Sequence, residues 1–347
     1  MAVLALVGIT AVAVRMMAAD ANGCSSGVKL TVAAAPEIAP SVQDAAREWM
    51  KTRPDVNGKC IQVAVQAVAA ADVAGSLAVR AGSGIDVAAK PAPTPDEADV
   101  PAVWIPETSA WLGRIAEADR TALATLAPSV AMSPVVFAVP ESVAQAMPPA
   151  YTRSGAGGLL AAALVDAQKA ITEHRAPALT MGLLDPRRDG ASLVAAIVVR
   201  DLVVTDETKL PALIAVYRLL NKGKVPDLAT LQKAYAQGVK AAPLSEQATL
   251  AINAAAPNAP LLALALPPGS PALDYPYATV TGKPREVELA AAKFRTALSG
   301  PTYRDAFAKH GFRAPDGSAG AGFPVGHGVT AAQAAGNPLT DPARVGE

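Results

Sequence analysis

Short apolar segments alternate with segments of helical periodicity along most of this chain. Apolar stretches at 28–34, 61–66 and 101–105 are each followed by residues whose apolar side chains recur at helical spacing. Such alternation implies right-handed β-α-β crossovers and a mainly parallel sheet. The sequence therefore predicts an α/β protein.

The stretch 133–140 has a particular place in this alternation. It is apolar, rich in β-branched residues and contains a proline near each end, which is typical of a buried strand. The alternation of strands and helices precedes it and begins again after it, with a strand expected at 178–184. We therefore expect 133–140 to lead from one α/β lobe to a second, and 347 residues suffice for two lobes. The alternative is an ordinary core strand.

Composition and charge restrict the classes of partner. Hydrophobic residues make up 51% of the chain and aromatic residues only 4%, so the core is expected to consist mostly of alanine, valine and leucine. The 30 basic residues balance the 30 acidic ones. There is no basic excess for nucleic acid and no basic face for a membrane surface. No nucleic-acid partner is predicted.

The N-terminal segment is typical of an exported protein. Residues 1–14 are almost wholly apolar and Arg15 ends the run, as in a secretory signal or a short membrane anchor. The run is shorter than the roughly 20 residues that span a bilayer comfortably. We expect residues 1–17 to be a signal peptide or membrane anchor outside the folded core. The alternative is a buried core helix.

The chain has two cysteines, Cys24 and Cys60, and both follow the export-like segment, where oxidation is possible. We predict a Cys24–Cys60 disulfide, which would stabilise the fold by roughly 4 kcal/mol in the chain-entropy model. The alternative is two free thiols in a cytosolic protein. The cysteines and the scattered His174, His310 and His327 show no zinc-ligand spacing, so no metal or cofactor is predicted.

Three loops are candidates for ligand contact. Ligands of parallel α/β sheets bind outside the carboxyl ends of the strands. In the first half of the chain this rule selects the loop from Ala35 to Glu37, and the loop Glu107-Thr108-Ser109 before Trp111. In the second half it selects the loop from Asp185 to Ser192. Hydroxyls beside a helix N-terminus suit a carbonyl or anionic group, although they are equally typical of plain helix caps.

Enzyme motifs are not found. The sequence contains no G-x-S-x-G elbow, and the glycines at 155–158 have neither a P-loop lysine nor the dinucleotide-binding spacing. We therefore predict that the chain is not an enzyme.

Four segments carry a family resemblance. They are the strand 133–140, the loop Asp185-Pro186 with Ser192 opening a helix, the stretch 273–277, and the helices from 294 to 313. In this order they resemble the interlobe strand, second-lobe ligand loop, return crossover and closing helices of extracellular solute-binding proteins of the type 2 periplasmic-binding fold. The resemblance covers about 28–317. It implies a two-lobed α/β fold with a central cleft and two interlobe crossovers.

The resemblance also implies a division of the chain. Residues 24–132 with 273–316 would form lobe 1 and residues 133–272 lobe 2. The Gly, Ala and Pro content of 317–347 predicts a flexible linker. The whole chain is most similar to the actinobacterial-type version, which has an N-terminal membrane anchor and a downstream von Willebrand factor A domain. In that arrangement the tail would lead to the second domain.

The function that the resemblance implies is an extracytoplasmic receptor, at the cell surface or anchored to the membrane. Its lobes would close on a small polar ligand, and a membrane or surface protein would bind the closed form. The alternative is a surface interaction module that has lost ligand binding and works with the downstream domain. The candidate ligand-binding residues are Ala35, Glu37, Thr108, Ser109, Trp111, Ser133, Asp185, Ser192 and Tyr275.

Two features of these candidates concern the ligand. Ser133 and Tyr275 are expected at the hinge. Hydroxyl groups and helix N-termini dominate the candidate residues, and this composition favours an uncharged polar or weakly anionic ligand. Molybdate-type family members present a serine after the first strand, where this sequence has Ala33 to Ala35. That departure weighs against an oxyanion ligand.

Overall fold

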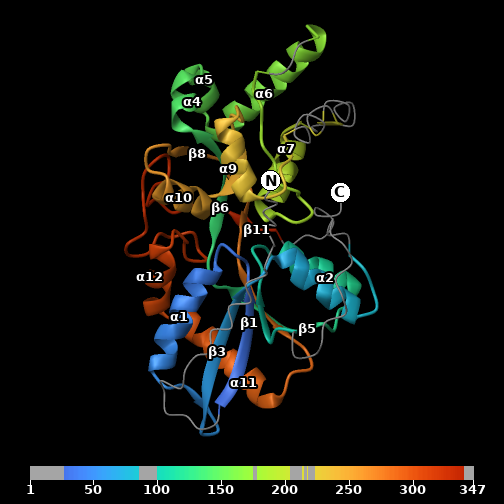
Figure 1. Cartoon of the computed structure of the whole chain (residues 1–347), viewed down its shortest axis with the longest axis vertical. Coiled ribbons are helices and arrows are strands. Elements are labelled where there is room, and N and C mark those ends of the chain that lie inside the picture. The colour runs from blue at the N-terminus through green and yellow to red at the C-terminus, as the bar shows by residue number, and fades with distance from the viewer. Residues whose placement is uncertain are drawn as a thin grey trace, which may run out of the picture.

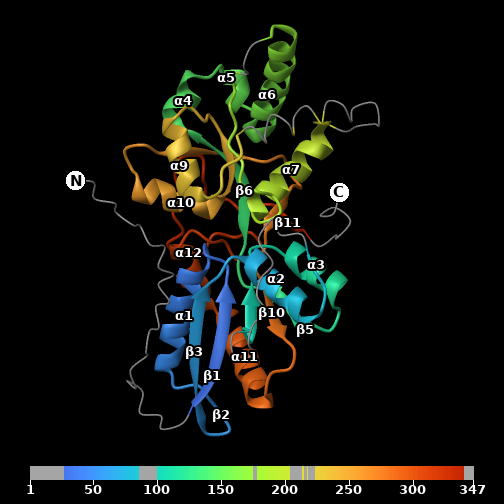
Figure 2. The same ribbon diagram turned by 45° about the vertical axis from the view of Figure 1, so that its right-hand side comes forward.

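The protein consists of two α/β lobes, one above the other along its long axis (Figures 1 and 2). The computed structural model describes residues 27–85, 100–174, 178–203, 213–214, 217 and 223–339. Residues 1–17, expected to be a signal peptide or anchor, and Cys24 lie outside this part. No helix within the described ranges is both long enough and apolar enough to cross a membrane.

Lobe 1 is built on a six-stranded mixed sheet. The strand order is β2 (Asp55–Val56), β3 (Lys59–Ala67), β1 (Gly27–Ala34), β4 (Val103–Ile105), β10 (Pro276–Val280) and β5 (Leu123–Ser129). As the alternating pattern predicts, β1 runs parallel to both β3 and β4. Strand β10 is antiparallel to β4 and β5, because it enters the sheet on its return from lobe 2.

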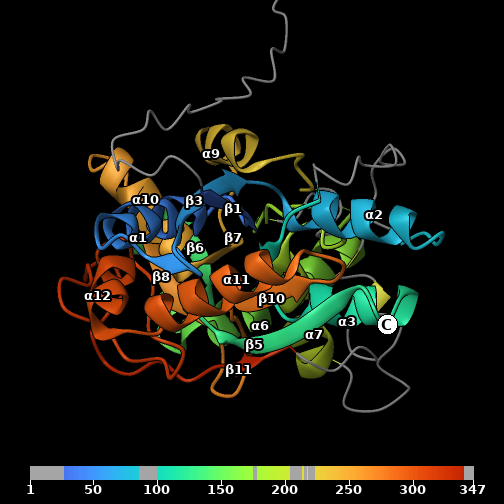
Figure 3. The same cartoon turned by 90° about the horizontal axis from the view of Figure 1, so that it is seen from below.

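Helices cover both faces of the lobe 1 sheet. One face is covered by α1 (Ala39–Lys51), α11 (Arg285–Leu298) and α12 (Pro301–Lys309), and the other by α2 (Ala70–Arg80) and α3 (Ala110–Ala118). Seen from below, α1 and α12 lie on the left and α2 and α3 on the right (Figure 3). The apolar stripe of α1 buries Val42, Ala45 and Trp49, and the ring of Trp49 packs 5.2 Å from that of Phe294.

Lobe 2 is built around β6 (Ser133–Pro140), the strand expected from the stretch 133–140. Its neighbours β7 (Ala242–Ser245), β8 (Leu261–Ala265) and β9 (Pro271–Leu273) are all antiparallel to it, and β11 (Asn337–Pro338) pairs with β9. The expectation of a mainly parallel sheet is therefore wrong for this lobe. Helix α10 (Glu246–Ala255) connects β7 and β8 across β6, so helical crossovers are present although the central strand runs the other way.

The remaining helices of lobe 2 form its outer layers. They are α4 (Glu141–Ala146), α5 (Pro149–Thr152), α6 (Gly155–Thr172), α7 (Gly190–Val203) and α9 (Leu228–Ala236). Leu159 of α6 and Val199 of α7 pack with Phe137 of β6 in one buried cluster. The segment expected as a strand at 178–184 forms only single bridges, Met181 with Ala241 and Leu183 with Lys224.

Three linkers join the lobes, one more than the two crossovers expected. The first runs through Val130 and Met132, the second through Asp274 and Tyr275, and the third follows α12 at Arg313. The Val130 amide donates to the Tyr275 carbonyl at 3.0 Å, and Met132 and Arg313 exchange two backbone hydrogen bonds of 2.9 Å. The three linkers therefore lie side by side.

The predicted flexible linker at 317–347 is wrong for residues 317–339, which pack on lobe 2. The Ala263 amide donates to the His327 carbonyl at 2.8 Å, and Val329 and Leu339 are buried. Glycine makes this packing possible: a Cβ on Gly328, at φ +89°, would lie 2.3 Å from the Ala263 carbonyl oxygen. Residues 340–347 lie outside the described part.

Arg313 fixes this C-terminal segment to lobe 2. Its Nε and Nη2 donate to the two carboxylate oxygens of Glu246 at 2.6 and 3.0 Å. The same guanidinium donates to the carbonyls of Thr330 and Ala332, each at 2.7 Å. Arg313 is 2% exposed, so the carboxylate of Glu246 and the carbonyl oxygens, rather than water, stabilise its positive charge.

Candidate functional site

The loops at the carboxyl ends of β1 and β4 face the N-terminus of α7 across the junction of the lobes. The Ala35 amide donates to the Ile105 carbonyl at 2.8 Å, which holds the two lobe 1 loops together. The largest apolar cluster includes Ala35 and Ile38 of lobe 1 with Ala191 and Val194 of lobe 2. The lobes are therefore closed on each other in this structure.

Glu37 connects both lobes and the hinge. Its Oε2 accepts a hydrogen bond of 2.5 Å from the Tyr275 hydroxyl and one of 3.1 Å from the Ser245 hydroxyl. Tyr275 belongs to the second linker and Ser245 ends β7 of lobe 2. Burial raises the pKa of Glu37, and the nearby charge of Asp189 adds to that effect, against the opposing hydrogen bonds.

Glu107 is the second carboxyl group at the junction. The Trp111 indole N–H donates to its Oε1 at 2.7 Å, and a Cβ added to Gly190 would lie 2.8 Å from Glu107 Cγ. Even an alanine at position 190 would therefore require Glu107 or the α7 backbone to shift, so glycine permits the lobes to approach this closely. Burial raises the pKa of Glu107 to about 8, and the negative charges of Asp189 and Glu37 contribute.

Asp189 is the third carboxyl group and belongs to lobe 2. It immediately precedes α7, and its Oδ2 accepts from the Ser192 amide at 2.7 Å, as in an N-cap. Burial raises its pKa, against the hydrogen bonds from Ser192. The electrostatic contributions to the pKa values of Glu37 and Glu107 come from carboxyl groups of this same set. Glu37, Glu107 and Asp189 are hereafter the carboxyl cluster.

Tyr275 holds the hinge beside the carboxyl cluster in a strained conformation. Its φ is +39°, a region that large side chains rarely adopt. Its amide donates to the Glu107 carbonyl at 3.3 Å, and its buried ring packs edge-on 5.1 Å from Phe312. Such conformations persist where the surroundings over-determine them, and they concentrate at binding and switch sites.

Two arginine contacts also cross between the lobes. Arg114 Nη1 donates to the Arg187 carbonyl at 3.3 Å, and Arg188 Nη2 donates to Asp72 Oδ1 at 2.6 Å. The Arg114 guanidinium lies 4.5 Å above the Trp111 ring, on the helix next to the carboxyl cluster. These contacts cover the rim of the closed junction.

Of the residues selected from the sequence, Ala35, Glu37, Trp111 and Tyr275 contribute to the junction. Thr108 and Ser109 stabilise the neighbouring loop and the second linker. Thr108 Oγ1 accepts from the Ala110 amide at 3.3 Å, and the Ser109 hydroxyl donates to Asp274 in the second linker. Their hydroxyls thus shape the loop and the hinge.

The other selected residues serve their own lobe. Ser133 Oγ accepts from the Gln247 amide at 3.0 Å, and Ser192 Oγ accepts from the Leu184 amide at 3.2 Å. Asp185 accepts from Arg187 and, at 2.8 Å, from Lys224. Partial burial opposes any lowering of the Asp185 pKa, but the bonds from Arg187 and Lys224 outweigh it and lower the pKa.

The candidate ligand-binding residues do not include Glu107, Asp189 and Ser245, although the loops selected from the sequence contain Glu107 and Asp189. Glu107 and Asp189 carried a recognisable signal: Glu107 lies two residues beyond the end of β4, and Asp189 stands at the N-cap position of an apolar helix. Ser245 stands at the N-cap of α10, but the short strand that it ends, Ala242–Ser245, contains no β-branched residue and gives no strand signal. Within the described ranges, no group of three or more His, Cys, Asp or Glu side chains is arranged to hold a metal ion.

Comparison with known proteins agrees with this architecture. Residues 30–313 match the family described as bacterial extracellular solute-binding protein. No curated protein matches the chain.

Solved structures share the two-lobed fold at low sequence identity. A periplasmic thiamin binding protein is 14% identical with a TM-score of 0.62, covering 93% of each chain. Iron-bound HitA from Pseudomonas aeruginosa is 13% identical with a TM-score of 0.57, covering 92% of this chain and 95% of that one. The sulfate-binding protein SubI from Mycobacterium tuberculosis H37Rv is 19% identical with a TM-score of 0.54, covering 86% and 92%.

The structural similarity establishes a shared fold, that of the type 2 periplasmic-binding proteins. The family match extends over more than half of the chain and includes strands of both lobes and the first two linkers. The chain therefore belongs to the bacterial extracellular solute-binding protein family.

Proposed function

We propose that the chain is an extracytoplasmic receptor that captures a small polar solute between its two lobes. The convergence of Glu37 and Glu107 from lobe 1, Asp189 from lobe 2 and Tyr275 from the hinge carries this proposal. Polar groups placed at the closing surfaces of two lobes are what a hinged receptor needs to recognise a ligand. Membership of an extracellular binding family supports the location and the absence of catalysis.

The carboxyl cluster favours some classes of solute over others. The ionised forms of Glu37 and Asp189 are already destabilised by burial, and a strong anion such as sulfate or molybdate would add further negative charge beside them. With a pKa of about 8, Glu107 is mostly protonated at neutral pH, and its carboxylic acid can donate a hydrogen bond to a ligand. A neutral ligand rich in hydroxyl or amide groups, or one with an ammonium group, suits these side chains.

A second candidate function is an interaction module that no longer captures a solute. The observation in its favour is that Glu37, Ser245 and Tyr275 already bridge the lobes with the protein's own side chains. In this form the chain would act through a membrane or surface protein. Residues 1–17 would anchor it, and a downstream von Willebrand factor A domain would be the functional partner.

A melting-temperature screen distinguishes the two functions. We expect a neutral or cationic solute among sugars, amino acids, peptides and polyamines to raise the melting temperature, because a ligand at 100 times its Kd adds about 2.7 kcal/mol. Glu37→Gln should reduce this shift, whereas Glu48→Gln, exposed on α1, should leave it unchanged. A flat screen in which sulfate and molybdate are also inactive would support the interaction module.

We also propose that Cys24 and Cys60 form a disulfide. Cys60 lies opposite Gly27 in the β1–β3 ladder, and Cys24 precedes Gly27 by three residues. Three residues reach roughly 10 Å, enough to return to Cys60. Intact mass of exported protein, measured with alkylation before and after reduction, should show thiols only after reduction. Two alkylated thiols in the unreduced protein would contradict the pairing.

A further inference from the structure

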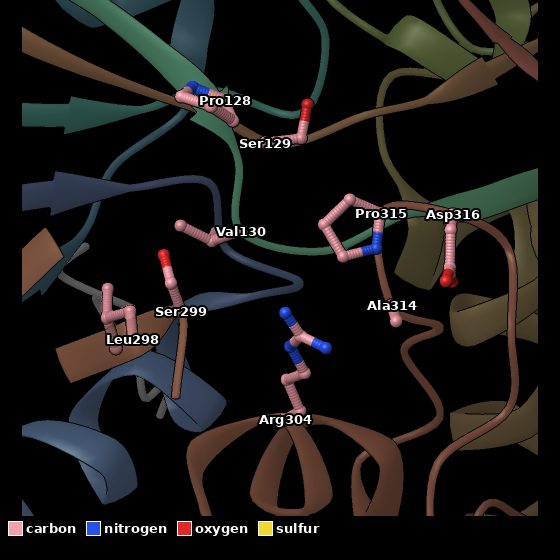
Figure 4. A pocket seen from close by; sticks show the side chains of 9 residues that line it. All are labelled: Pro128, Ser129, Val130, Leu298, Ser299, Arg304, Ala314, Pro315 and Asp316. Carbon is pink, nitrogen blue, oxygen red and sulfur yellow. The ribbon is translucent and has the colours of Figure 1, made fainter. Parts of the chain in front are cut away.

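A pocket of about 260 Å³ lies at the hinge and contains no member of the carboxyl cluster. Its walls come from the end of β5 with the first linker, the end of α11, the first turn of α12 and the third linker. Figure 4 shows these side chains around a common space. The pocket is therefore separate from the site proposed above.

Two of the walls are linkers between the lobes. Val130 belongs to the first linker, and Ala314 to Asp316 continue the third, directly after Arg313. Met132 and Arg313 hold these linkers together through two backbone hydrogen bonds of 2.9 Å. Hinge bending changes the backbone angles of linkers. The shape of this pocket therefore depends on the relative position of the lobes.

The pocket contains one cation, Arg304. Its guanidinium points from α12 into the open space (Figure 4). Across the described ranges it has no hydrogen bond and no ion pair within 4.0 Å. Asp316 stands at the edge, but its Oδ1 accepts from the Ser318 amide at 2.9 Å and from the Ser318 hydroxyl at 2.6 Å. Besides these hydrogen bonds from Ser318, the charge of Arg304 also helps to lower the pKa of Asp316, but no hydrogen bond joins the two side chains. The Arg304 guanidinium can therefore still donate to an anionic ligand.

Apart from Arg304, Asp316 and two hydroxyls, the lining is apolar. The Ser129 hydroxyl donates to Asp274 at 3.3 Å and the Ser299 hydroxyl donates to the Arg295 carbonyl at 3.1 Å. Pro128, Leu298 and Pro315 face the space around Arg304, and the prolines have no N–H to offer a ligand. A guanidinium beside an apolar wall suits a carboxylate attached to a small apolar body. Asp316 disfavours a second negative charge, and the volume lies below the range typical of drug-sized ligands. These features select a small monoanion.

We propose that this hinge pocket is an effector site for a small carboxylate monoanion with an apolar body. Arg304 binds its carboxylate, and the occupied pocket holds the first and third linkers in the arrangement seen here. The proposal does not depend on the identity of the solute between the lobes, since the two sites share no residue.

Benzoate serves as the probe, and calorimetric titration as the measurement. We expect benzoate to bind the full chain and Arg304→Gln to weaken binding about tenfold or more, the effect of losing a charged hydrogen bond. Lys309→Gln removes the same charge from the exposed end of the same helix and should leave benzoate affinity unchanged. Inorganic phosphate should bind more weakly than benzoate.

Hydrogen exchange tests the effect on the hinge. Saturating benzoate should slow exchange at 128–132 and 313–316 in wild type and not in Arg304→Gln. Equal benzoate affinity of wild type and Arg304→Gln, no benzoate binding at all, or tighter binding of phosphate would each overturn the proposal. So would benzoate binding that leaves both linkers unprotected.

Discussion

Replacing Glu107 with glutamine is expected to reduce the loss of stability that the wild-type protein shows between pH 5 and pH 9. In the unfolded chain this carboxyl group loses its proton near its ordinary pKa of 4.5, but in the folded protein it keeps the proton up to about pH 8. Stability from this group is therefore complete below pH 4.5 and falls as pH rises through 8. The difference corresponds to at most roughly 5 kcal/mol at pH 9.

Glutamine suits this test because its carbonyl oxygen still accepts from the Trp111 indole N–H while it carries no proton to lose. Free energies of unfolding from urea titrations at pH 5, 7 and 9 give the pH profile. Glu117→Gln, on the exposed side of the same helix α3, is the matched control and should retain the wild-type profile. Parallel profiles for Glu107→Gln and wild type would show that Glu107 is hydrated and that the lobes are open in solution.

Arg313→Met is expected to destabilise the protein by about 3–5 kcal/mol and to release the segment 317–339 from lobe 2. The substitution leaves the carboxylate of Glu246 buried without its partner, and it leaves the Thr330 and Ala332 carbonyls without their donor. A buried charge without a partner lowers the free energy of unfolding far more than the loss of an exposed ion pair does. Urea titration measures the loss, and limited proteolysis measures the release of the segment.

Two further variants separate the buried charge from the packing. Arg313→Met with Glu246→Met should be more stable than Arg313→Met alone, because no unpaired charge is then buried. Arg285→Met breaks an exposed pair with Glu288 and should cost less than about 1 kcal/mol. If Arg313→Met costs no more than Arg285→Met and the segment 317–339 stays protected from protease, the third linker does not fix the C-terminal segment.

The part of the fold that the sequence predicted well consists of strands with a strong local pattern. Strand β6 coincides with the stretch 133–140, since a run of β-branched residues with a proline near each end admits few other structures. The strand Ala242–Ser245 was missed because it has no such pattern, and its place is determined by pairing with β6. Strand direction in lobe 2 depends on this pairing, which periodicity does not encode.

The prediction of a flexible linker after residue 316 is wrong for a related reason. Glycine and proline between 317 and 339 look like a linker, yet the glycines permit the backbone of this segment to approach lobe 2 closely. Arg313, which binds the segment, looks in sequence like any surface arginine. Only the distant Glu246, 67 residues away, makes it a buried partner.

The candidate site also combines features that the local sequence predicts with contacts that depend on distant parts of the chain. The strand-end rule selected loops that lie at the junction of the lobes, because that rule follows from how parallel sheets are built. It did not identify which side chains meet. The bond between Ser245 and Glu37 joins residues 208 positions apart, and the burial that alters Glu107 exists only after both lobes have closed.

Hydrogen exchange in the presence of a captured solute tests the proposed receptor function most directly. The full chain is compared with and without the solute that raises its melting temperature most, at saturating concentration. Receptor function predicts slower exchange at 33–38, 105–112 and 183–194 together, because these loops carry the carboxyl cluster and belong to both lobes. Protection confined to one lobe or to an outer surface, or the absence of any stabilising solute, would contradict capture between the lobes.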